Sequence, residues 1–199
     1  MTSARIDSLS RRDLLAGLAA AVSASALGCK SKREGVTVGL YCSLTGPQAD
    51  FGISTRRGVE MAFDELNRAG GVLGQRLRLA VEDTRGDASE ATSAVTRLID
   101  REGAMAIVGE IASPLSLAGG RVCQRRHIPM ISPSSTNPAV TEIGDYVFRV
   151  CFIDPFQGRV MAQFAKNTLH FDRVAIFKDE AAAYSVGLAQ AFREAFSGM

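Results

Sequence analysis

One segment, Ala104 to Pro138, constrains the fold most strongly, because its pattern predicts a strand, a turn, a helix, a strand and a turn. Its first apolar run, Ala104–Val108, is typical of a parallel strand that is covered on both faces. The second strand, His127–Ile131, leads directly into a turn rich in serine and proline. Both turns follow the carboxyl ends of neighbouring strands, where open parallel sheets bind their ligands. We therefore expect a binding site at this edge of the sheet.

The helix of this segment supplies the chemistry of the expected site. Ser113 is predicted to be its hydroxyl N-cap, with Pro114 at the first helical position. Basic residues at positions 125–127 suit its negative end. The helix N-terminus lies beside hydroxyl groups of both turns, which are carried by Ser113, Ser134, Ser135 and Thr136. Such a cluster predicts a site for a small molecule that bears an anionic group.

Strands and helices alternate along the rest of the chain. The further strands are expected at Val36–Tyr41, Arg76–Glu82, Tyr146–Val150 and Arg173–Phe177, the last one buried. The further helices are expected at Ile53–Ala69, after a capping box at Asp87–Glu90, at Asp154–Leu169 with Met161, Phe164 and Ala165 facing inward, and over Leu188–Phe196. Strict alternation of this kind predicts the α/β class with a doubly wound parallel sheet.

The first 29 residues are expected to be a targeting segment. Arg11 and Arg12 form a twin-arginine pattern ahead of the uncharged run Leu14–Gly28. A helix of that length reaches about 22 Å, short of the roughly 30 Å of a bilayer core, which favours a signal peptide over an anchor. Residues 26–29 resemble a lipobox, so Cys29 is predicted to carry a lipid at the outer face of a membrane; an incidental cysteine after a cleaved signal is the alternative. Residues 30–35 would be a tether.

Several function classes are disfavoured by the sequence. The net charge of +2 offers no electrostatic case for binding nucleic acid. Neither a G-x-S-x-G turn nor a G-x-G-x-x-G loop after the first strand is present, so we expect no enzyme and no cofactor. Cys42, Cys123 and Cys151 lack metal-ligand spacing, and His127 and His170 have no partners at such spacing, so no metal is expected. Whether two of the three cysteines pair is left open.

Six motifs in order resemble one family. They are SLTGPQADFG, RRGVEMAFDELNRAGGVLGQRLRLAVEDTRGD, IVGEIAS, IPMISPSSTNP, YVFRV and RVAIFKDEAAAYSVGLAQAF, which together cover Val36 to about Phe196. They resemble the branched-chain amino acid (leucine/isoleucine/valine) binding proteins of bacterial ABC transporters, which have the type I periplasmic binding fold. The resemblance implies two lobes that close on an amino acid: an incomplete first lobe at 36–152 and the start of a second at 153–199. The chain would then be the front part of a longer protein.

The resemblance also implies roles for individual residues. Ser113 would bind the ligand's α-carboxylate, and Phe51 would lie near its side chain. Tyr184, from the second lobe, would close over it. Contacts to the carboxylate and the ammonium would come from Ser134, Ser135 and Thr136. The implied function is delivery of a small amino acid, of unspecified identity, to a membrane permease; the alternative is the sensor domain of a signalling receptor with the same fold.

Overall fold

A parallel sheet forms the centre of residues 35–199, the part of the chain that the computed structural model describes. Its strands are β1 (Val36–Cys42), β2 (Leu77–Asp83), β3 (Ala106–Val108), β4 (Met130–Ser132) and β5 (Val147–Arg149). They lie in the order β2-β1-β3-β4-β5, and each neighbouring pair is parallel. The predicted α/β class is confirmed. The predictions for Arg11, Arg12, Cys29 and most of the tether lie outside the described residues.

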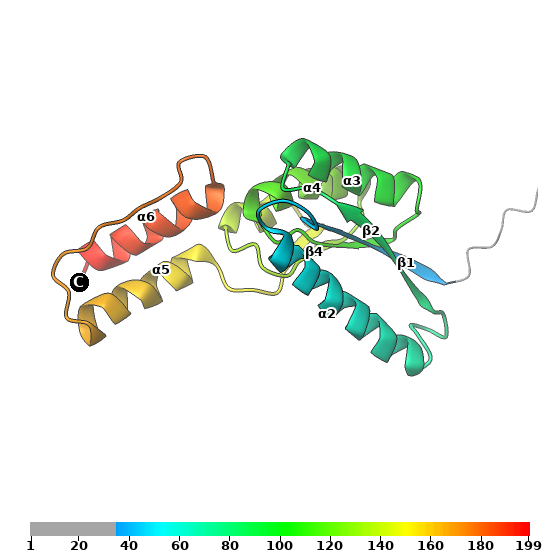
Figure 1. Ribbon diagram of the computed structural model, residues 1–199, viewed down its shortest axis with the longest axis horizontal. Helices are drawn as coiled ribbons and strands as arrows, with labels where there is room; N and C mark the ends of the chain where they lie inside the picture. The colour runs from blue at the N-terminus through cyan, green and yellow to red at the C-terminus, as the bar shows by residue number, and fades with distance from the viewer. Residues whose placement is uncertain (1–34) are drawn as a thin grey trace, which may run out of the picture. The chain divides into compact units, whose positions relative to one another are not determined.

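Helices cover both faces of the sheet, as a doubly wound fold requires. α3 (Ala88–Asp100) and α4 (Ser113–Arg126) pack side by side on one face, and α2 (Ala49–Arg68) lies on the other (Figure 1). A 3₁₀ turn, η1 (Pro138–Ile143), precedes β5. After β5 follow α5 (Asp154–Gln163), a π-helical turn η2 (Phe164–Thr168) and α6 (Ala183–Ser197).

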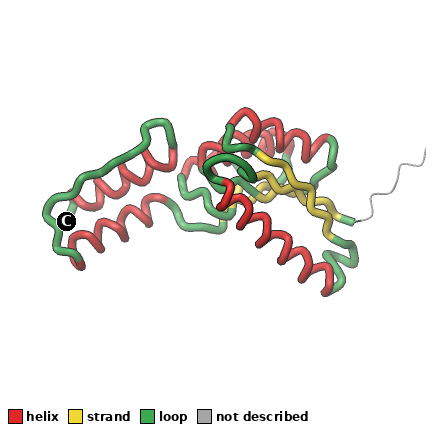
Figure 2. The backbone as a smooth tube through the Cα atoms, in the orientation of Figure 1, coloured by secondary structure: helices red, strands yellow, loops and turns green. Residues whose placement is uncertain are grey.

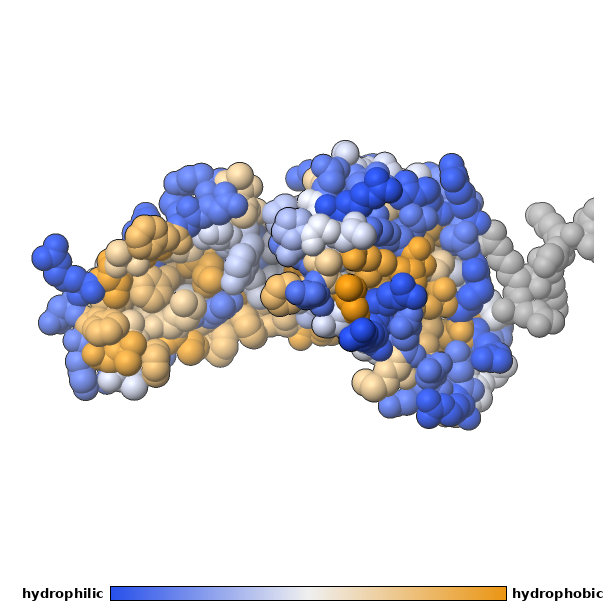
Figure 3. All heavy atoms as spheres, in the orientation of Figure 1, coloured by the Kyte–Doolittle hydropathy of each residue, from blue (hydrophilic) through white to orange (hydrophobic). Residues whose placement is uncertain are grey.

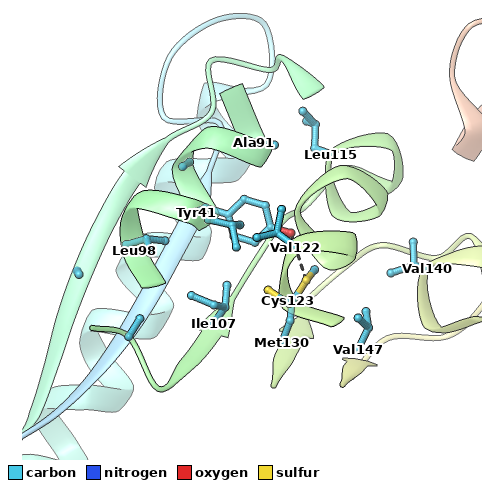
Figure 4. Close-up of a cluster of buried hydrophobic side chains, with 14 residues drawn as sticks. Tyr41, Ala91, Leu98, Ile107, Leu115, Val122, Cys123, Met130, Val140 and Val147 are labelled. Carbon is cyan, nitrogen blue, oxygen red and sulfur yellow. Dashed lines mark hydrogen bonds between the residues drawn. The ribbon is translucent and has the colours of Figure 1, made fainter. Parts of the chain in front are cut away.

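The main core lies between the sheet and the face of α3 and α4. Leu98, Ile107 and Met130 are buried there around the ring of Tyr41, whose hydroxyl donates to the Met130 sulfur over 3.3 Å (Figure 4). A Cβ at Gly119 of α4 would stand 2.6 Å from the Tyr41 ring, so only glycine allows α4 to approach the sheet this closely.

The capping box before α3 is confirmed, because Asp87 is the N-cap and its carboxylate accepts from the Glu90 backbone N–H over 2.8 Å. The predicted start of α4 is wrong by one residue: Ala112 is the N-cap, and Ser113 is the first helical residue. The Ser113 hydroxyl instead accepts from the Asn137 backbone N–H over 3.3 Å. α2 begins four residues earlier than predicted, so Phe51 belongs to its first turn rather than to a loop.

The predicted strand Arg173–Phe177 does not form. The whole segment between η2 and α6 is irregular (Figure 2), and Phe177 is 97% exposed. Met161 and Phe164, predicted to face inward, are also exposed, whereas Ala165 is buried as expected. A strand needs a neighbour for its backbone hydrogen bonds, and residues 35–199 supply none here. Apolar atoms therefore gather on the surface of α5 and α6 (Figure 3).

Three further findings concern the helices, the metal-ligating side chains and the cysteines of residues 35–199. None of its helices combines the length and the apolar character that a membrane crossing needs. Residues 35–199 also contain no group of His, Cys, Asp or Glu side chains arranged to hold a metal ion. Cys42, Cys123 and Cys151 are free thiols.

Candidate binding site

The turns after β3 and β4 lie against each other at the carboxyl edge of the sheet. Besides the contact between Ser113 and Asn137, the Ser134 hydroxyl donates to the Ile111 carbonyl over 3.0 Å. The structure thus brings together Ser113, Ser134, Ser135 and Thr136, four of the six residues that the sequence predicted for the ligand site.

The hydroxyl groups of this cluster differ in whether they already have hydrogen-bond partners. Ser135 is buried, and its Oγ lies 2.7 Å from Ser116 Oγ and 3.1 Å from the Glu110 carbonyl oxygen. Thr136 is also buried, but its Oγ1 has no hydrogen-bond partner among the described residues. An unsatisfied buried hydroxyl is unfavourable by itself. A hydrogen bond from Thr136 Oγ1 to a ligand would therefore be favourable.

A buried carboxylate that the sequence analysis missed lies beside Thr136. The Asp154 side chain, at the first residue of α5, is 1% exposed, and neither oxygen has a hydrogen-bond partner within residues 35–199. Its backbone N–H donates to the Thr136 carbonyl over 2.9 Å, which keeps the two residues adjacent. In sequence, an aspartate followed by proline at a helix start indicates only an ordinary cap, so no local signal set this carboxylate apart.

The surroundings of Asp154 change its pKa. Burial raises the pKa of this carboxyl above its ordinary value. The nearby Thr136 hydroxyl, although not at hydrogen-bond geometry, and the Arg149 guanidinium act in the opposite direction without cancelling the effect of burial. A cationic group placed at Asp154 would supply the missing partner.

Arg149 holds the β4 turn in place. Its Nη1 donates to the carbonyls of Ser135 and Asn137, both over 2.8 Å, and its Nη2 donates to the Pro138 carbonyl over 2.9 Å and to Thr141 Oγ1 over 2.6 Å. Guanidinium groups suit such multiple contacts, because their donors lie in one rigid plane. The turn that carries Thr136 is thereby fixed.

The start of α6 also reaches this cluster. The Asn137 side chain donates to the Ala183 carbonyl over 2.9 Å, so Tyr184 stands one residue from a contact with the β4 turn. A Cβ at Gly187 would lie 3.0 Å from both the Asn137 Nδ2 and the Asp154 Oδ2. The structure thus brings the N-terminal part of α6 to Asp154, and Tyr184 in the first turn of this helix is 39% exposed.

Phe51 lies on the first turn of α2 and not in the cluster. Its ring is 71% exposed on the first turn of α2. The next residue, Gly52, packs so closely on Ser43 that a Cβ would collide with the Ser43 carbonyl oxygen. Phe51 is therefore held at the carboxyl edge of β1, with a free aromatic face.

Two opposite electrostatic environments meet at this edge. Ala112, the N-cap of α4, makes no side-chain cap, and its own backbone N–H donates to the Glu110 carboxylate; the helix dipole at this end favours an anion. Asp154, joined to that terminus through Thr136, Asn137 and Ser113, favours a cation. A small molecule with a carboxylate and an ammonium close together would satisfy both.

Comparison with known proteins shows the family of this chain. Residues 35–198 match the model of a family described as periplasmic binding protein. This chain belongs to that family. A Leu/Ile/Val-binding protein, BraC3, of Rhizobium johnstonii is 33% identical over 159 residues, which are 79% of this chain and 43% of that protein.

Solved structures place this family member among the type I periplasmic binding proteins. A leucine-binding protein, LivK, of Thermotoga maritima superposes with a TM-score of 0.78 and 41% identity, covering 82% of this chain and 46% of that one. The substrate-binding protein LivJ of Streptococcus pneumoniae, solved with isoleucine, gives a TM-score of 0.79 and 30% identity, covering 81% and 47%. This chain therefore spans less than half the length of each of these proteins.

Proposed function

We propose that this periplasmic binding protein captures a branched-chain amino acid outside the cytoplasm and delivers it to the permease of an ABC transporter. The observation that carries the proposal is the Asp154 carboxylate beside the Thr136 hydroxyl, both buried and both without a hydrogen-bond partner among the described residues, near the N-terminus of α4. The ligands named for its relatives, leucine, isoleucine and valine, support the choice of amino acid.

Each end of the amino acid has a counterpart in the site. The α-carboxylate would lie at the N-terminus of α4, with the Ser113 hydroxyl and the Ser134 backbone N–H as donors. The ammonium would donate to Asp154 and Thr136. Phe51 and Tyr184 would contact the ligand side chain from the first turns of α2 and α6.

Simple energies indicate how tightly this site would bind. A helix N-terminus contributes roughly 0.3–1 kcal/mol, and each hydrogen bond to a charged group about 1.5–3 kcal/mol. Two such bonds and the helix give about 3–7 kcal/mol before the entropic costs of binding, whereas micromolar affinity needs about 8 net. We expect millimolar affinity from these residues alone.

The remaining features of the whole protein form part of the same proposal. Residues 36–152 would be a first lobe, and residues 153–199 would begin a second one that closes over the ligand. The N-terminal segment would direct export, with a lipid on Cys29 holding the protein at the membrane surface. Its role would be binding and release, without catalysis.

The test is an NMR titration of the isotope-labelled chain with L-leucine, L-isoleucine and L-valine to about 20 mM, well above the expected dissociation constant. Saturable shifts of the Thr136, Asn137 and Asp154 amides are expected. The matched control is 4-methylpentanoate, which is leucine without its ammonium group and should cause no saturable shift. Absence of saturation with all three amino acids, or an equal response to the control, would refute the proposal.

A further inference from the structure

Glu110, in the turn after β3, is a charged residue with no exposed surface. Burying a carboxylate is strongly unfavourable unless donors surround it. Three donors do so here: Ser43 Oγ and Thr84 Oγ1 each lie 2.8 Å from Oε1, and the Ala112 backbone N–H reaches Oε2 over 2.8 Å. Since Ser43 follows β1 and Thr84 follows β2, one side chain joins the turns of three strands.

The backbone carbonyl of Glu110 extends these contacts to the next strand. The hydroxyls of Ser116, Ser132 and Ser135 lie 2.9, 2.7 and 3.1 Å from this oxygen. Ser132 is the last residue of β4, and its Oγ also accepts from the Ser135 backbone N–H over 3.0 Å. A single residue thus connects the carboxyl ends of β1, β2, β3 and β4.

The surroundings of Glu110 leave little room for another arrangement. Ser43, Thr84, Ser116 and Ser132 have no exposed surface, so water cannot replace the contacts. Charge-assisted hydrogen bonds in such a setting are strong and geometrically narrow. The electrostatic effect reaches Cys42, where burial first and the Glu110 charge second raise the pKa of the thiol to about 12.

We propose that Glu110 is a positioning residue that fixes the N-terminus of α4 relative to the turn carrying Thr136. This inference rests on the proposed function, because these two segments are the ones that would hold the amino acid. Glu110 acts on the first segment through its carboxylate, which accepts from the backbone N–H of Ala112, the N-cap of α4. It acts on the second through its backbone carbonyl, which accepts from the hydroxyl of Ser135, the residue before Thr136.

The test compares Glu110→Gln with Glu110→Ala in the 199-residue chain by amide hydrogen exchange and by L-leucine titration. Glutamine can accept from the Ala112 N–H through its oxygen and donate from its amide to the oxygens of Ser43 and Thr84, so the positioning contacts are kept. The readout amides are those of Ser135 and Asn137, which bond to Ser132 and Ser113 and not to the Glu110 carboxylate.

Protection of these two amides, relative to the buried Ile107 amide, should stay within about threefold of wild type in Glu110→Gln and fall by about tenfold or more in Glu110→Ala, the equivalent of losing one positioning contact. Leucine should still saturate Glu110→Gln and should bind Glu110→Ala at least about tenfold more weakly. Val95→Ala, a core substitution in α3 away from the turns, is the matched control and should change neither readout.

Unchanged relative protection in Glu110→Ala, or equal losses in both variants, would overturn the proposal. If Glu110→Ala does not fold, Thr84→Val takes its place, because it removes one of the two hydroxyl donors to Oε1, and the same loss is expected at smaller amplitude. A wild-type chain without any leucine response would refute the proposed function, while the exchange measurement would still decide the role of Glu110.

Discussion

Replacing Asp154 by asparagine should make the empty protein more stable and the ligand site inactive. The carboxylate is buried without a hydrogen-bond partner among the described residues, so the folded state is destabilised whenever it is charged. Asparagine has nearly the same shape and no charge, and its amide can donate to the Thr136 hydroxyl. The same change removes the acceptor that we assign to the ligand's ammonium.

Two opposing energies set the size of the stabilisation. Relief of an unsatisfied buried polar group contributes about 1–3 kcal/mol. Asp154 also lies in the first turn of α5, where a negative charge is favoured by roughly 0.3–1 kcal/mol, and this contribution is lost. The net gain should be about 1 kcal/mol, which for a chain of this size raises the Tm by about 2–4 °C.

The assay is thermal unfolding of the empty chain, followed by the leucine titration. Asp50→Asn is the matched control, because Asp50 lies in the first turn of α2 with an exposed side chain. It should lower the Tm slightly, through the lost helix interaction alone. Asp154→Asn should show no saturable response to leucine, since a charge-assisted hydrogen bond of about 1.5–3 kcal/mol is lost from a millimolar site.

The pH dependence gives this prediction a sign that can be checked. Because burial raises the pKa of Asp154 in the folded state, its contribution to stability is fully present below the ordinary aspartate pKa and is lost as the pH rises through the raised value. The Tm difference between Asp154→Asn and wild type should therefore vanish at low pH and grow toward neutrality. A lower Tm for Asp154→Asn at neutral pH, or a difference independent of pH, would refute the reasoning.

Three further substitutions, the last with a matched control, test the site, the turn that carries it and the packing of α4 on the sheet. Thr136→Val removes an unpartnered hydroxyl at nearly constant volume and should stabilise the empty chain by about 1 kcal/mol while weakening leucine binding; a lower Tm would show that the hydroxyl has a partner. Arg149→Lys cannot reach all four acceptors and should lower the free energy of unfolding in urea by about 2–3 kcal/mol, so an unchanged midpoint would contradict its role. Gly119→Ala should lower the free energy of unfolding by about 1–3 kcal/mol, because the added Cβ collides with Tyr41. Gly58→Ala in α2 is the control: no atom lies within 4 Å of its added Cβ, so it should raise the free energy of unfolding by up to about 1 kcal/mol. Similar effects at both glycines would contradict the packing argument.

Local chemistry explains why much of the fold was predictable. Asp87 and Glu90 carry a complete cap within four residues, and the stripe of Ala91, Val95 and Leu98 has helical spacing, so neither needs information from elsewhere in the chain. β1 and β3 form from apolar runs of the kind that a sheet covered on both faces requires, whereas the edge strands β2 and β5 also carry charged residues. Strand ends differ from the prediction by up to three residues, because backbone pairing and not composition decides them.

The unpredicted features depend on contacts that the sequence does not display. Glu110 and Asp154 are buried carboxylates, and a carboxylate in a sequence normally indicates a surface position. Only the fold shows that the hydroxyls of Ser43 and Thr84 donate to the Glu110 carboxylate. It also shows that no hydrogen-bond partner within residues 35–199 reaches the Asp154 carboxylate. Phe177 shows the opposite case: its apolar run is typical of a buried strand, but burial requires a covering element.

The strand order also has a consequence for how the chain reaches its native state. After β2 pairs with β1, each later strand, β3, then β4, then β5, is added beside the previous edge of the sheet in the order in which it leaves the ribosome. Each of these additions requires closure of only one strand–helix unit, so the five strands can pair without a segment from beyond residue 149. Folding can therefore proceed during synthesis, and the newest unpaired edge is always the three-residue strand most recently added.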